Sequence, residues 1–154
     1  MGESNLRRLN GIELAVFSGR LNSICEEMGL VLQKSALSPN IKDRLDFSCA
    51  FFDCQGRIMA QAAHIPVHLG SMAYAMRDIV AKFEWSEGDV LVLNDPFMGG
   101  THLPDVTLIS PLFINKTLLG FLANRAHHAN IGCESAGSMP LSTSLSEEGV
   151  LISP

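Results

Sequence analysis

Two apolar runs joined by a two-residue turn constrain the fold of this chain more than any other feature. Residues 106–113 and 117–126 are rich in Val, Ile, Leu and Phe, and the dipeptide Asn115-Lys116 lies between them. Such runs around a tight turn predict a β-hairpin. With the turn as centre, paired residues have numbers that sum to about 231. Asp105 should therefore lie opposite His127, to within one position, at the open end of the hairpin.

The sequence predicts another hairpin earlier in the chain. Residues 46–52 and 57–61 form two short apolar runs on either side of a turn that contains Gly56. With paired numbers that sum to about 109, Asp46 should lie opposite Ala63 and next to His64. The open end of this hairpin would then carry a carboxylate and an imidazole.

Two stretches of the sequence have helical spacing. Residues 10–36 place apolar side chains at steps of three and four, and Asn10 with Glu13 matches a capping box, so this stretch predicts an amphipathic helix. The helix should end at Ser38-Pro39-Asn40. A second helix is expected over residues 70–83, with Ser71 as its N-terminal cap.

The remaining segments complete an α+β fold. Residues 89–93 predict a short buried strand, and residues 94–100 a loop. Residues 131–149 are rich in Gly and Ser and lack a sustained period, and residues 150–154 resemble the start of another strand. We therefore expect an N-terminal amphipathic helix, two β-hairpins, a second helix and a long glycine- and serine-rich loop.

The composition predicts that the chain is part of a larger domain. Of its 154 residues, 47% are hydrophobic and only 18% are charged, whereas a domain of this size buries about 70% of the surface of its chain. This apolar excess predicts either a partner or further polypeptide. We expect residues 1–154 to be one segment of that larger domain.

The net charge argues against two classes of partner. The chain has 11 Lys+Arg and 16 Asp+Glu, a net charge of −5, which lacks the basic surface that nucleic acids and anionic membranes select. No apolar run reaches the length of about 20 residues that a membrane span needs. The first residues lack the apolar core of a signal peptide, and the four cysteines show no C-x-x-C spacing. We expect reduced thiols, a cytoplasmic location, and no nucleic-acid or membrane partner.

The residues Thr-His-Leu-Pro-Asp at 101–105 predict a metal site. Pro104 disfavours helical geometry at Leu103, and in polyproline geometry a residue three positions on returns to the same side. His102 and Asp105 can then converge with His127 from the hairpin. Two imidazoles and a carboxylate suit Zn, Mn or Fe with open positions for water or substrate. A lone histidine is more often a hydrogen-bonded structural residue, which is the alternative for each of these.

The other hairpin offers further groups to the same site. If the two open ends face each other, Asp46 is a fourth ligand, and His64 or His68 is a general base or a donor to a metal ligand. The alternative for Asp46 is to cap a turn or to pair with Arg44. His128 should point to the face of the strand opposite that of His127.

We expect the loop after the short strand to approach the substrate. The glycines at positions 99 and 100 do not match a phosphate-binding motif, and they either let the backbone come close to the site or make the loop mobile. Ser138 is not in a nucleophile elbow, and nothing marks Cys133 as activated. The expected substrate-binding residues are Asn94, Asp95, Gly99, Gly100 and His128.

Several long blocks of this sequence resemble the hydantoinase B/oxoprolinase family. The resemblance covers nearly the whole chain from about residue 10, and the blocks follow one another in the order of the family. They are Arg-Leu-Asp-Phe-Ser-Cys-Ala (44–50), Ala-Gln-Ala-Ala-His-Ile-Pro-Val-His-Leu-Gly-Ser-Met (60–72), Asn-Asp-Pro-Phe-Met-Gly-Gly-Thr-His-Leu-Pro-Asp-Val-Thr (94–107), Asn-Arg-Ala-His-His-Ala-Asn-Ile-Gly (124–132), Gly-Ser-Met-Pro (137–140) and Glu-Glu-Gly (147–149).

The resemblance implies an ATP-dependent ring-opening or carboxylating system with two parts. An A-type partner subunit uses ATP to phosphorylate the substrate, and the B-type part, which this chain resembles, completes hydrolysis or carboxylation at a divalent metal. The family's metal ligands map onto Asp46, His102, Asp105 and His127. B-type proteins are normally several hundred residues long, so the resemblance implies that residues 1–154 are an amino-terminal segment or a truncated product.

Three functions stay open at this point. The first is a metal-dependent component of a cyclic-amide hydrolase of the 5-oxoprolinase or hydantoinase type, in which His64 or His68 moves protons. The second is a subunit of a ketone carboxylase of the acetone or acetophenone type. The third is a non-catalytic fragment that acts only in subunit assembly.

Overall fold

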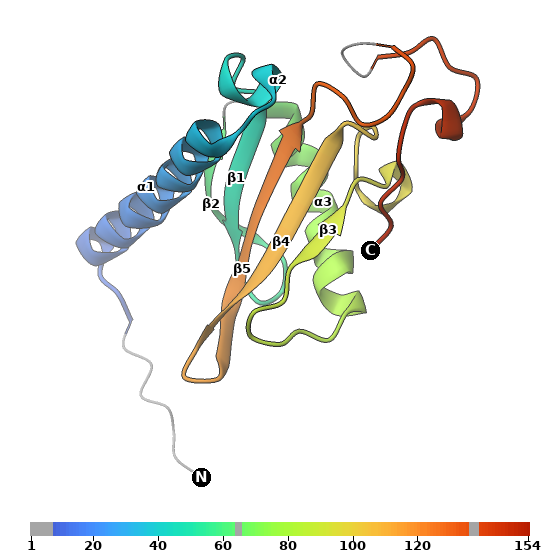
Figure 1. Ribbon diagram of the computed structural model, residues 1–154. Coiled ribbons are helices and arrows are strands. Elements are labelled where there is room, and N and C mark those ends of the chain that lie inside the picture. Colours follow the sequence, from blue (N-terminus) through green and yellow to red (C-terminus); the bar gives the residue numbers. More distant parts are fainter. Residues whose placement is uncertain (1–7, 64–65, 136–138) are drawn as a thin grey trace.

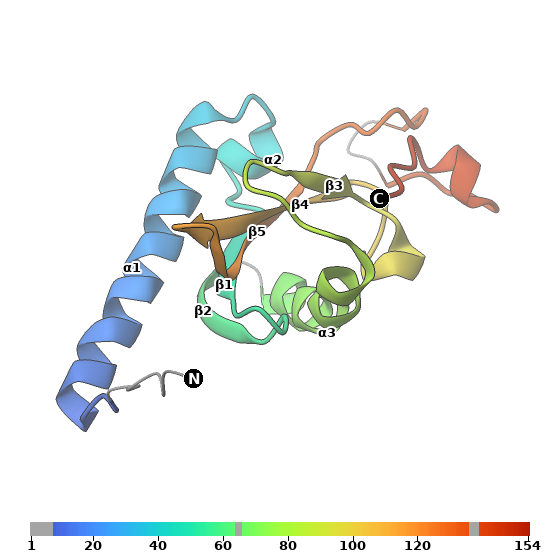
Figure 2. The same cartoon turned by 90° about the horizontal axis from the view of Figure 1, so that it is seen from below.

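A five-stranded antiparallel sheet with helices on both faces forms the framework of the protein (Figure 1). The computed structural model describes residues 8–63, 66–135 and 139–154. The strand order is β2-β1-β5-β4-β3. Helix α1 lies over one face of the sheet beside β1 and β2, and α3 lies under the other face (Figure 2). The expected α+β class is confirmed.

The hairpin that constrained the fold most strongly is present in the expected place. Strand β4 (Asp105–Ile114) and strand β5 (Thr117–His127) are joined by Asn115 and Lys116, which both have positive φ values (49° and 65°). Two residues with positive φ are what a type I′ hairpin turn requires. One register shift beside Leu112 moves the pairing by one position, so Asp105 lies opposite His127.

The earlier hairpin is also present, but the predicted register was wrong by two residues. Strand β1 (Phe47–Phe52) pairs with β2 (Ile58–Ala63), and Ala63 lies opposite Ser48 rather than Asp46. Two causes add up. Asp53 N–H donates to the carbonyl of Arg57 (2.9 Å), which moves the centre of the turn onward, and a bulge beside Phe52 adds a further shift.

The two hairpins are joined edge to edge, so their open ends lie side by side. Strand β1 pairs directly with β5, and Phe47 lies opposite Ala126. One step beyond that pair, the backbone N–H of His127 donates to the carbonyl of Asp46 (2.9 Å). The condition that would bring Asp46 towards the predicted metal site is therefore met by strand pairing.

Helix α1 (Gly11–Ser35) forms as its capping pattern predicted. The side chain of Asn10 accepts a hydrogen bond from Glu13 N–H, and the carboxylate of Glu13 accepts one from Asn10 N–H. The buried residues Cys25 and Gly29 face the sheet. The helix ends a few residues before the expected stop, and a short helix α2 (Pro39–Lys42) follows. Together α1 and α2 cover the β1 and β2 half of one sheet face.

Helix α3 (Pro66–Lys82) begins one turn earlier than expected, and Ser71 is not its cap. Ser71 lies inside the helix, and its hydroxyl donates to the carbonyl of His68 (3.2 Å). Pro66 explains the earlier start, because proline is favoured in the first turn of a helix. This helix buries an apolar stripe against the sheet. The stripe and the sheet residues that it contacts are Met72, Ala75, Met76, Ile79, Ala50, Phe52, Leu93, Ile109, Phe121 and Ala123.

The rest of the chain lies at the β3 edge of the sheet. Strand β3 (Leu91–Leu93) is followed by the 3-10 helix η1 (Pro96–Met98), and the long loop after β5 contains a second 3-10 turn, η2 (Leu145–Glu147). Residues 150–154 form no strand, although the backbone N–H of Asn94 donates to the carbonyl of Ile152 (3.1 Å). In the part of the chain that the structure describes, no helix is long and apolar enough to cross a membrane.

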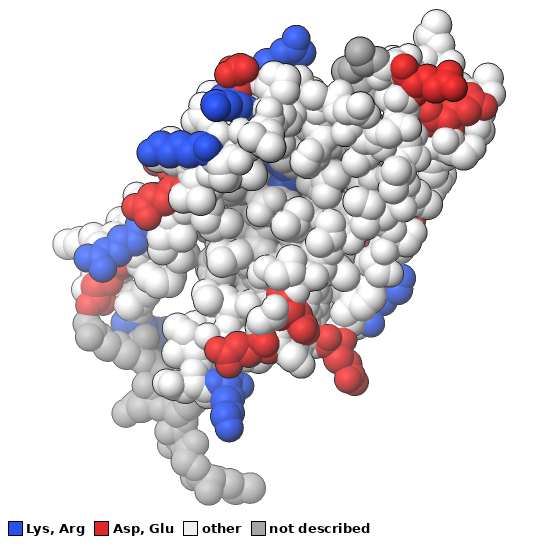
Figure 3. All heavy atoms as spheres, in the orientation of Figure 1, with Lys and Arg blue, Asp and Glu red and all other residues white. Residues whose placement is uncertain are grey.

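Charged side chains avoid the middle of the sheet face that α1 leaves open. Figure 3 shows this face as a broad area with almost no Lys, Arg, Asp or Glu side chains, and most charges lie along α1 and at the lower and upper margins. Val106, Leu108 and Ala126 line a groove there together with residues of α1 and α2. The apolar excess of the composition is thus partly exposed on one face.

Candidate metal centre

Three side chains meet at the shared open end of the hairpins. Nε2 of His102 lies 2.9 Å from Nδ1 of His127 and 3.3 Å from Oδ1 of Asp105, and the same Asp105 oxygen lies 3.2 Å from Nδ1 of His127. Among the described residues, this is the only group of three ligand side chains that could hold one metal ion. The sequence predicted these three residues together.

Strand pairing and a turn bring the three residues together. Asp105 and His127 are a directly opposed pair of β4 and β5. His102 is placed by a hydrogen-bonded turn, in which Asp105 N–H donates to the carbonyl of His102 (3.1 Å). The expected polyproline geometry was wrong here. Pro104 does not prevent this turn, because the missing proline N–H is neither the donor nor the acceptor of the bond that closes it.

His68 joins the group from α3. Its ring is 3% exposed, and Nε2 lies 3.6 Å from Oδ1 of Asp46 and 3.6 Å from Oδ2 of Asp105. Nδ1 of His68 is buried and has no hydrogen-bond partner among the described residues. A buried nitrogen without a hydrogen bond lowers the stability of the folded state. His68 therefore links the two carboxylates and keeps one ring atom available for a further group.

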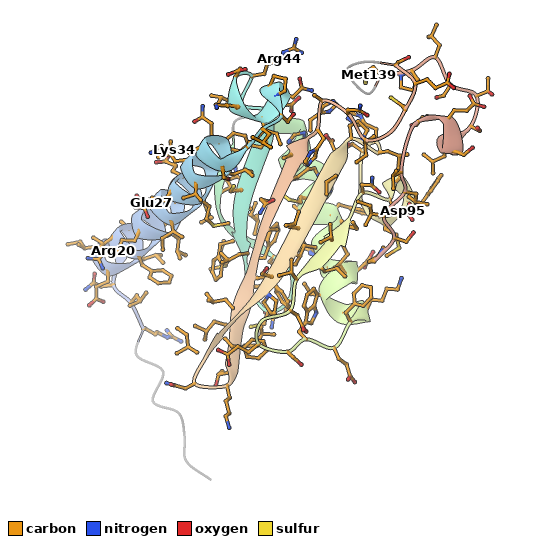
Figure 4. The ribbon with its side chains drawn as sticks, in the orientation of Figure 1. Arg20, Glu27, Lys34, Arg44, Asp95 and Met139 are labelled. Atoms are coloured by element: carbon orange, nitrogen blue, oxygen red, sulfur yellow. The ribbon has the colours of Figure 1, made fainter. Side chains whose placement is uncertain are left out.

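Asp46 lies at the edge of the group rather than inside it. Its side chain is 28% exposed, and its carboxylate is within ion-pair distance of His68. The alternative ion pair with Arg44 does not form among the described residues, and Figure 4 shows the Arg44 side chain pointing outward from the end of the molecule. Leu45 directs the chain into this position with a left-handed backbone (φ 57°).

Asp105 is the electrostatic centre of the group. Burial would raise the pKa of its carboxyl, but hydrogen bonds from His102, His127, His68 and Thr101 outweigh burial and hold the pKa well below its usual range. Asp105 is therefore ionised at neutral pH. An ionised carboxylate between imidazoles is a suitable ligand for a divalent cation.

The donor set fits a divalent metal ion. A tetrahedral ion with bonds of about 2.0–2.2 Å to nitrogen and oxygen separates its ligand atoms by ~3.4 Å, and the three separations here are 2.9, 3.2 and 3.3 Å. Two imidazole nitrogens that face each other must either share a proton or bind one cation. His102, Asp105 and His127 would hold such an ion, with Asp46 and His68 beside it.

Two of the expected substrate-binding side chains have structural partners instead. The Asn94 amide donates to the carbonyls of Leu103 and Val150 (both 2.8 Å), and its oxygen accepts from Ile152 N–H (2.7 Å). Asp95 lies beside η1 (Figure 4), where its carboxylate caps the short helix by accepting from Phe97 N–H. A substrate contact by either side chain stays an untested prediction.

The two loop glycines fill tight spaces. Gly99 has φ +88°, and a Cβ atom there would lie 1.9 Å from Cβ of Ala75 on α3. A Cβ atom on Gly100 would lie 2.7 Å from the carbonyl oxygen of Asp95. Close approach of the backbone, which was one of the two expectations for these glycines, thus occurs against α3 and within the loop. Their contact with a substrate stays untested.

The structure separates His128 from the group. His128 lines the groove on the opposite face of the sheet with Val106 and Ala126, as the alternation along β5 predicted. Burial first and the His127 charge second lower the pKa of His128, although the charge of Asp105 raises it. His64, one of the two proposed general bases, lies outside the described residues.

Sequence reasoning missed three polar residues beside the group. Thr101 donates a short hydrogen bond to Asp105, and Arg125 and Ser71 contact each other behind it. Arg125 was detectable, because it precedes His127 by two residues on a strand and so shares its face. Ser71 carried no such signal, because its helix begins earlier than the sequence indicated.

Known proteins resemble this chain over almost its full length. The family model described as Hydantoinase B/oxoprolinase matches residues 10–154. The 5-oxoprolinase of Saccharomyces cerevisiae is 47% identical over 148 residues, which are 94% of this chain and 12% of that protein. An uncharacterised protein of Methanocaldococcus jannaschii is 44% identical over 152 residues, which are 95% of this chain and 27% of that protein.

Two solved structures share the fold. The ATP-dependent caprolactamase from Pseudomonas jessenii matches with a TM-score of 0.82 and 30% identity, covering 96% of this chain and 26% of that one. A nucleotide-free acetone carboxylase matches with a TM-score of 0.76 and 22% identity, covering 88% of this chain and 18% of that one. The chain thus spans 27% or less of the length of each of these four proteins.

Proposed function

Because this chain belongs to the hydantoinase B/oxoprolinase family, we propose that it is the metal-binding segment of an ATP-dependent cyclic-amide hydrolase. One observation carries the proposal. The buried, ionised carboxylate of Asp105 lies within 3.6 Å of the ring nitrogens of His68, His102 and His127. A carboxylate with imidazole ligands is the donor set of catalytic zinc and related ions, which keep a position open for substrate or water.

We assign separate roles to the metal ligands and to His68. A divalent Zn, Mn or Fe ion held by His102, Asp105 and His127 would polarise a lactam or hydantoin carbonyl or bind the attacking water. His68 would take up the proton at Nδ1, the ring atom without a partner, while the carboxylates at Nε2 stabilise the charged ring. Asp46 would serve as the fourth, more exposed ligand.

The proposal includes an A-type partner that uses ATP. The support comes from similar proteins: 5-oxoprolinases from several organisms are 46–48% identical to this chain, and the caprolactamase of similar fold is ATP-dependent. Opening a stable cyclic amide by hydrolysis requires activation, and an A-type subunit that phosphorylates the substrate would supply it. The substrate is then a small cyclic amide.

A hydrolase is favoured over the alternative ketone carboxylase. The acetone carboxylase is 22% identical to this chain, and a likeness at that level supports the fold alone. The relatives named 5-oxoprolinase are about twice as similar in sequence. A role in subunit assembly without catalysis predicts no bound metal, which separates it from both enzymes by a direct measurement.

Metal content tests the proposal. We expect the purified protein to bind about one divalent ion per chain by elemental analysis, and expect His102→Ala and Asp105→Asn to lose most of it, because each removes one of three ligands. Asp78→Asn, which removes the same charge from the exposed face of α3, should keep full occupancy. Equal metal content in all four proteins would refute the assignment. Ring opening of 5-oxoproline with ATP and an A-type subunit then distinguishes catalysis from binding alone.

A further inference from the structure

The largest fully buried side chain among the described residues carries a positive charge. Arg125 is 1% exposed and lies two residues before His127 on β5, on the same face of the sheet. It pairs across the hairpin with Thr107, which lies two residues after Asp105. Its guanidinium therefore lies directly behind the proposed metal ligands, at a distance along the strand of about 7 Å.

Arg125 connects β5 to three other parts of the molecule. Nε donates to the hydroxyl of Thr107 on β4 (2.8 Å), Nη1 donates to the hydroxyl of Ser71 on α3, and Nη2 donates to the carbonyl of Gly99 (2.8 Å). Two of these contacts lead to the metal centre. The Ser71 hydroxyl donates a hydrogen bond to the carbonyl of His68. Gly99 precedes His102 by three residues in the same loop.

Burial alone does not explain why this residue is an arginine. All three acceptors are neutral, and no carboxylate lies within ion-pair distance of Arg125 in the part of the chain that the structure describes. Burial lowers the pKa of the guanidinium, and the nearby charge of Asp105 opposes this shift only in part. Burying a charge without a direct ion pair is unfavourable, and apolar residues of similar volume often stabilise a protein equally well or better. The feature that only arginine supplies is a rigid fork whose donors reach three acceptors in fixed directions.

We propose that Arg125 is a positioning residue that holds α3 and the Gly99 turn against β5, and thereby sets where His68 and His102 stand around Asp105. This inference rests on the proposed metal site. The same strand carries the fork and the ligand His127. Helix α3 and the Gly99 turn lie outside the hairpin, and Arg125 fixes both to β5. They are therefore aligned to the strand that carries His127. A ligand displaced by even half an ångström weakens a site of this kind.

Cobalt binding tests the proposal without any turnover. Titration of the metal-free chain with Co²⁺, followed by visible absorption, reports both affinity and coordination geometry. We expect Arg125→Lys, which keeps the charge but loses the fork, and Arg125→Met, which loses both, to lower Co²⁺ affinity about tenfold or more and to change the band shape. Thr107→Val removes the bond to β4 alone, so it should lower thermal stability while keeping Co²⁺ affinity. Arg77→Met, on the exposed face of α3, is the charge control.

The outcomes separate this inference from the proposed function. Unchanged Co²⁺ affinity and spectra in both Arg125 variants would overturn the positioning role, and retention in Arg125→Lys alone would mean that the charge acts and the fork does not. If the unaltered chain binds no Co²⁺, the metal site itself fails. Long-range ¹H–¹⁵N spectra of the histidine rings then test positioning in the metal-free chain. We expect the His68 and His102 signals to move in Arg125→Lys while His128 stays, and unmoved signals would overturn the inference.

If the Arg125 variants unfold, a second variant tests the inference, and the same histidine spectra report on it. Ser71→Ala removes the link from Arg125 to α3, together with the hydrogen bond from the Ser71 hydroxyl to the carbonyl of His68, and leaves the link to Gly99 in place. It should shift the ring signals of His68 more than those of His102, because His102 keeps its connection through Gly99. Equal shifts in both rings, or none, would contradict the separate routes on which the inference depends.

Discussion

The two faces of the sheet differ sharply although the same strands form both. On β4 and β5, Asp105, Thr107, Arg125 and His127 point towards α3, where they are buried in a network of hydrogen bonds. Their immediate neighbours in sequence point the other way and line an open, uncharged groove beside α1. The groove residues on these strands or directly after them are Val106, Leu108, Asn124, Ala126 and His128.

This comparison shows that alternation along two paired strands is enough to place the candidate metal ligands on one face of the sheet and the apolar groove on the other. A β-strand sends successive side chains to opposite faces, so a single hairpin supplies two ligands to one face and an apolar lining to the other. The α3 face is closed by a helix that adds His68. On the α1 face, α1 packs over β1 and β2, and α2 contacts one end of β5. A substitution on one face can therefore be compared with the unaltered residues of the other face.

The largest contrast is expected between the neighbouring histidines. His127→Ala should lower metal affinity at least a hundredfold, because it removes a ligand, whereas His128→Ala on the other face should change it less than twofold. Isothermal titration with Zn²⁺ measures both. A loss of similar size in the two variants would break the comparison between the faces.

The Gly99 turn provides a test of packing against α3. Gly99→Ala should lower the free energy of unfolding by about 3 kcal/mol, through the left-handed conformation and the clash with Ala75. Gly88→Ala is the matched control, since Gly88 has a similar φ (+93°) but open space around its Cβ position, and should cost about 1 kcal/mol. Urea denaturation measures both, and equal losses would mean that the contact with α3 contributes nothing.

The low pKa of Asp105 predicts a stability difference in acid. Because folding lowers this pKa, the ionised carboxylate stabilises the folded state above the ordinary value of 3.8, and this contribution is lost as the pH falls below it. For the metal-free protein, unfolding free energy should drop more steeply below pH 4 than in Asp105→Asn, by up to about 1.4 kcal/mol per pH unit. Parallel pH profiles from urea denaturation would contradict this.

Thiol labelling tests how completely α1 covers its half of the sheet. Burial, with a smaller effect of Cys25, raises the pKa of Cys49 to about 12, and burial raises that of Cys25. Both should resist iodoacetamide at pH 8 in the folded chain, while the partly exposed Cys133 reacts. Mass spectrometry of labelled peptides would count the modified thiols. Rapid labelling of Cys49 would mean that α1 leaves the sheet readily.

The smallest effect is expected on the open part of the α1 face. Asn124→Ser should change the unfolding free energy by less than about 0.5 kcal/mol and leave metal affinity unaltered, because Asn124 lines the open groove. Thermal unfolding followed by circular dichroism measures the first quantity. A loss above about 1 kcal/mol would show that this face is better packed than its exposure indicates.

The elements were largely predictable from local patterns. The capping box at Asn10 and the turn at Asn115-Lys116 fixed the long helix and the second hairpin, because both signals depend on residues close in sequence. The pairing of Asp105 with His127 followed from the same turn. The register of the first hairpin was wrong by two residues, because neither the exact centre of its turn nor the bulge beside Phe52 leaves a mark in a simple alternation of apolar residues.

The site was predictable only where one hairpin controlled it. His102, Asp105 and His127 were assembled correctly because a short turn and a strand pair place them, although the expected geometry at Pro104 was wrong. The fork of Arg125 was not predictable, since its acceptors come from a helix, a strand and a loop that meet only in the folded chain. Contacts between distant segments require the fold itself.

The turn of the second hairpin has a practical consequence for handling this protein. Asn115 and Lys116 lie ten and eleven residues from Asp105 along the chain, which is about 33 Å or more of extended strand. Extra residues added at this tip do not alter the pairing near the ligands, because the pairing there is also fixed by β1. The tip is therefore the place to insert a fluorescent label or an affinity tag without disturbing the end of the molecule that carries the proposed metal site.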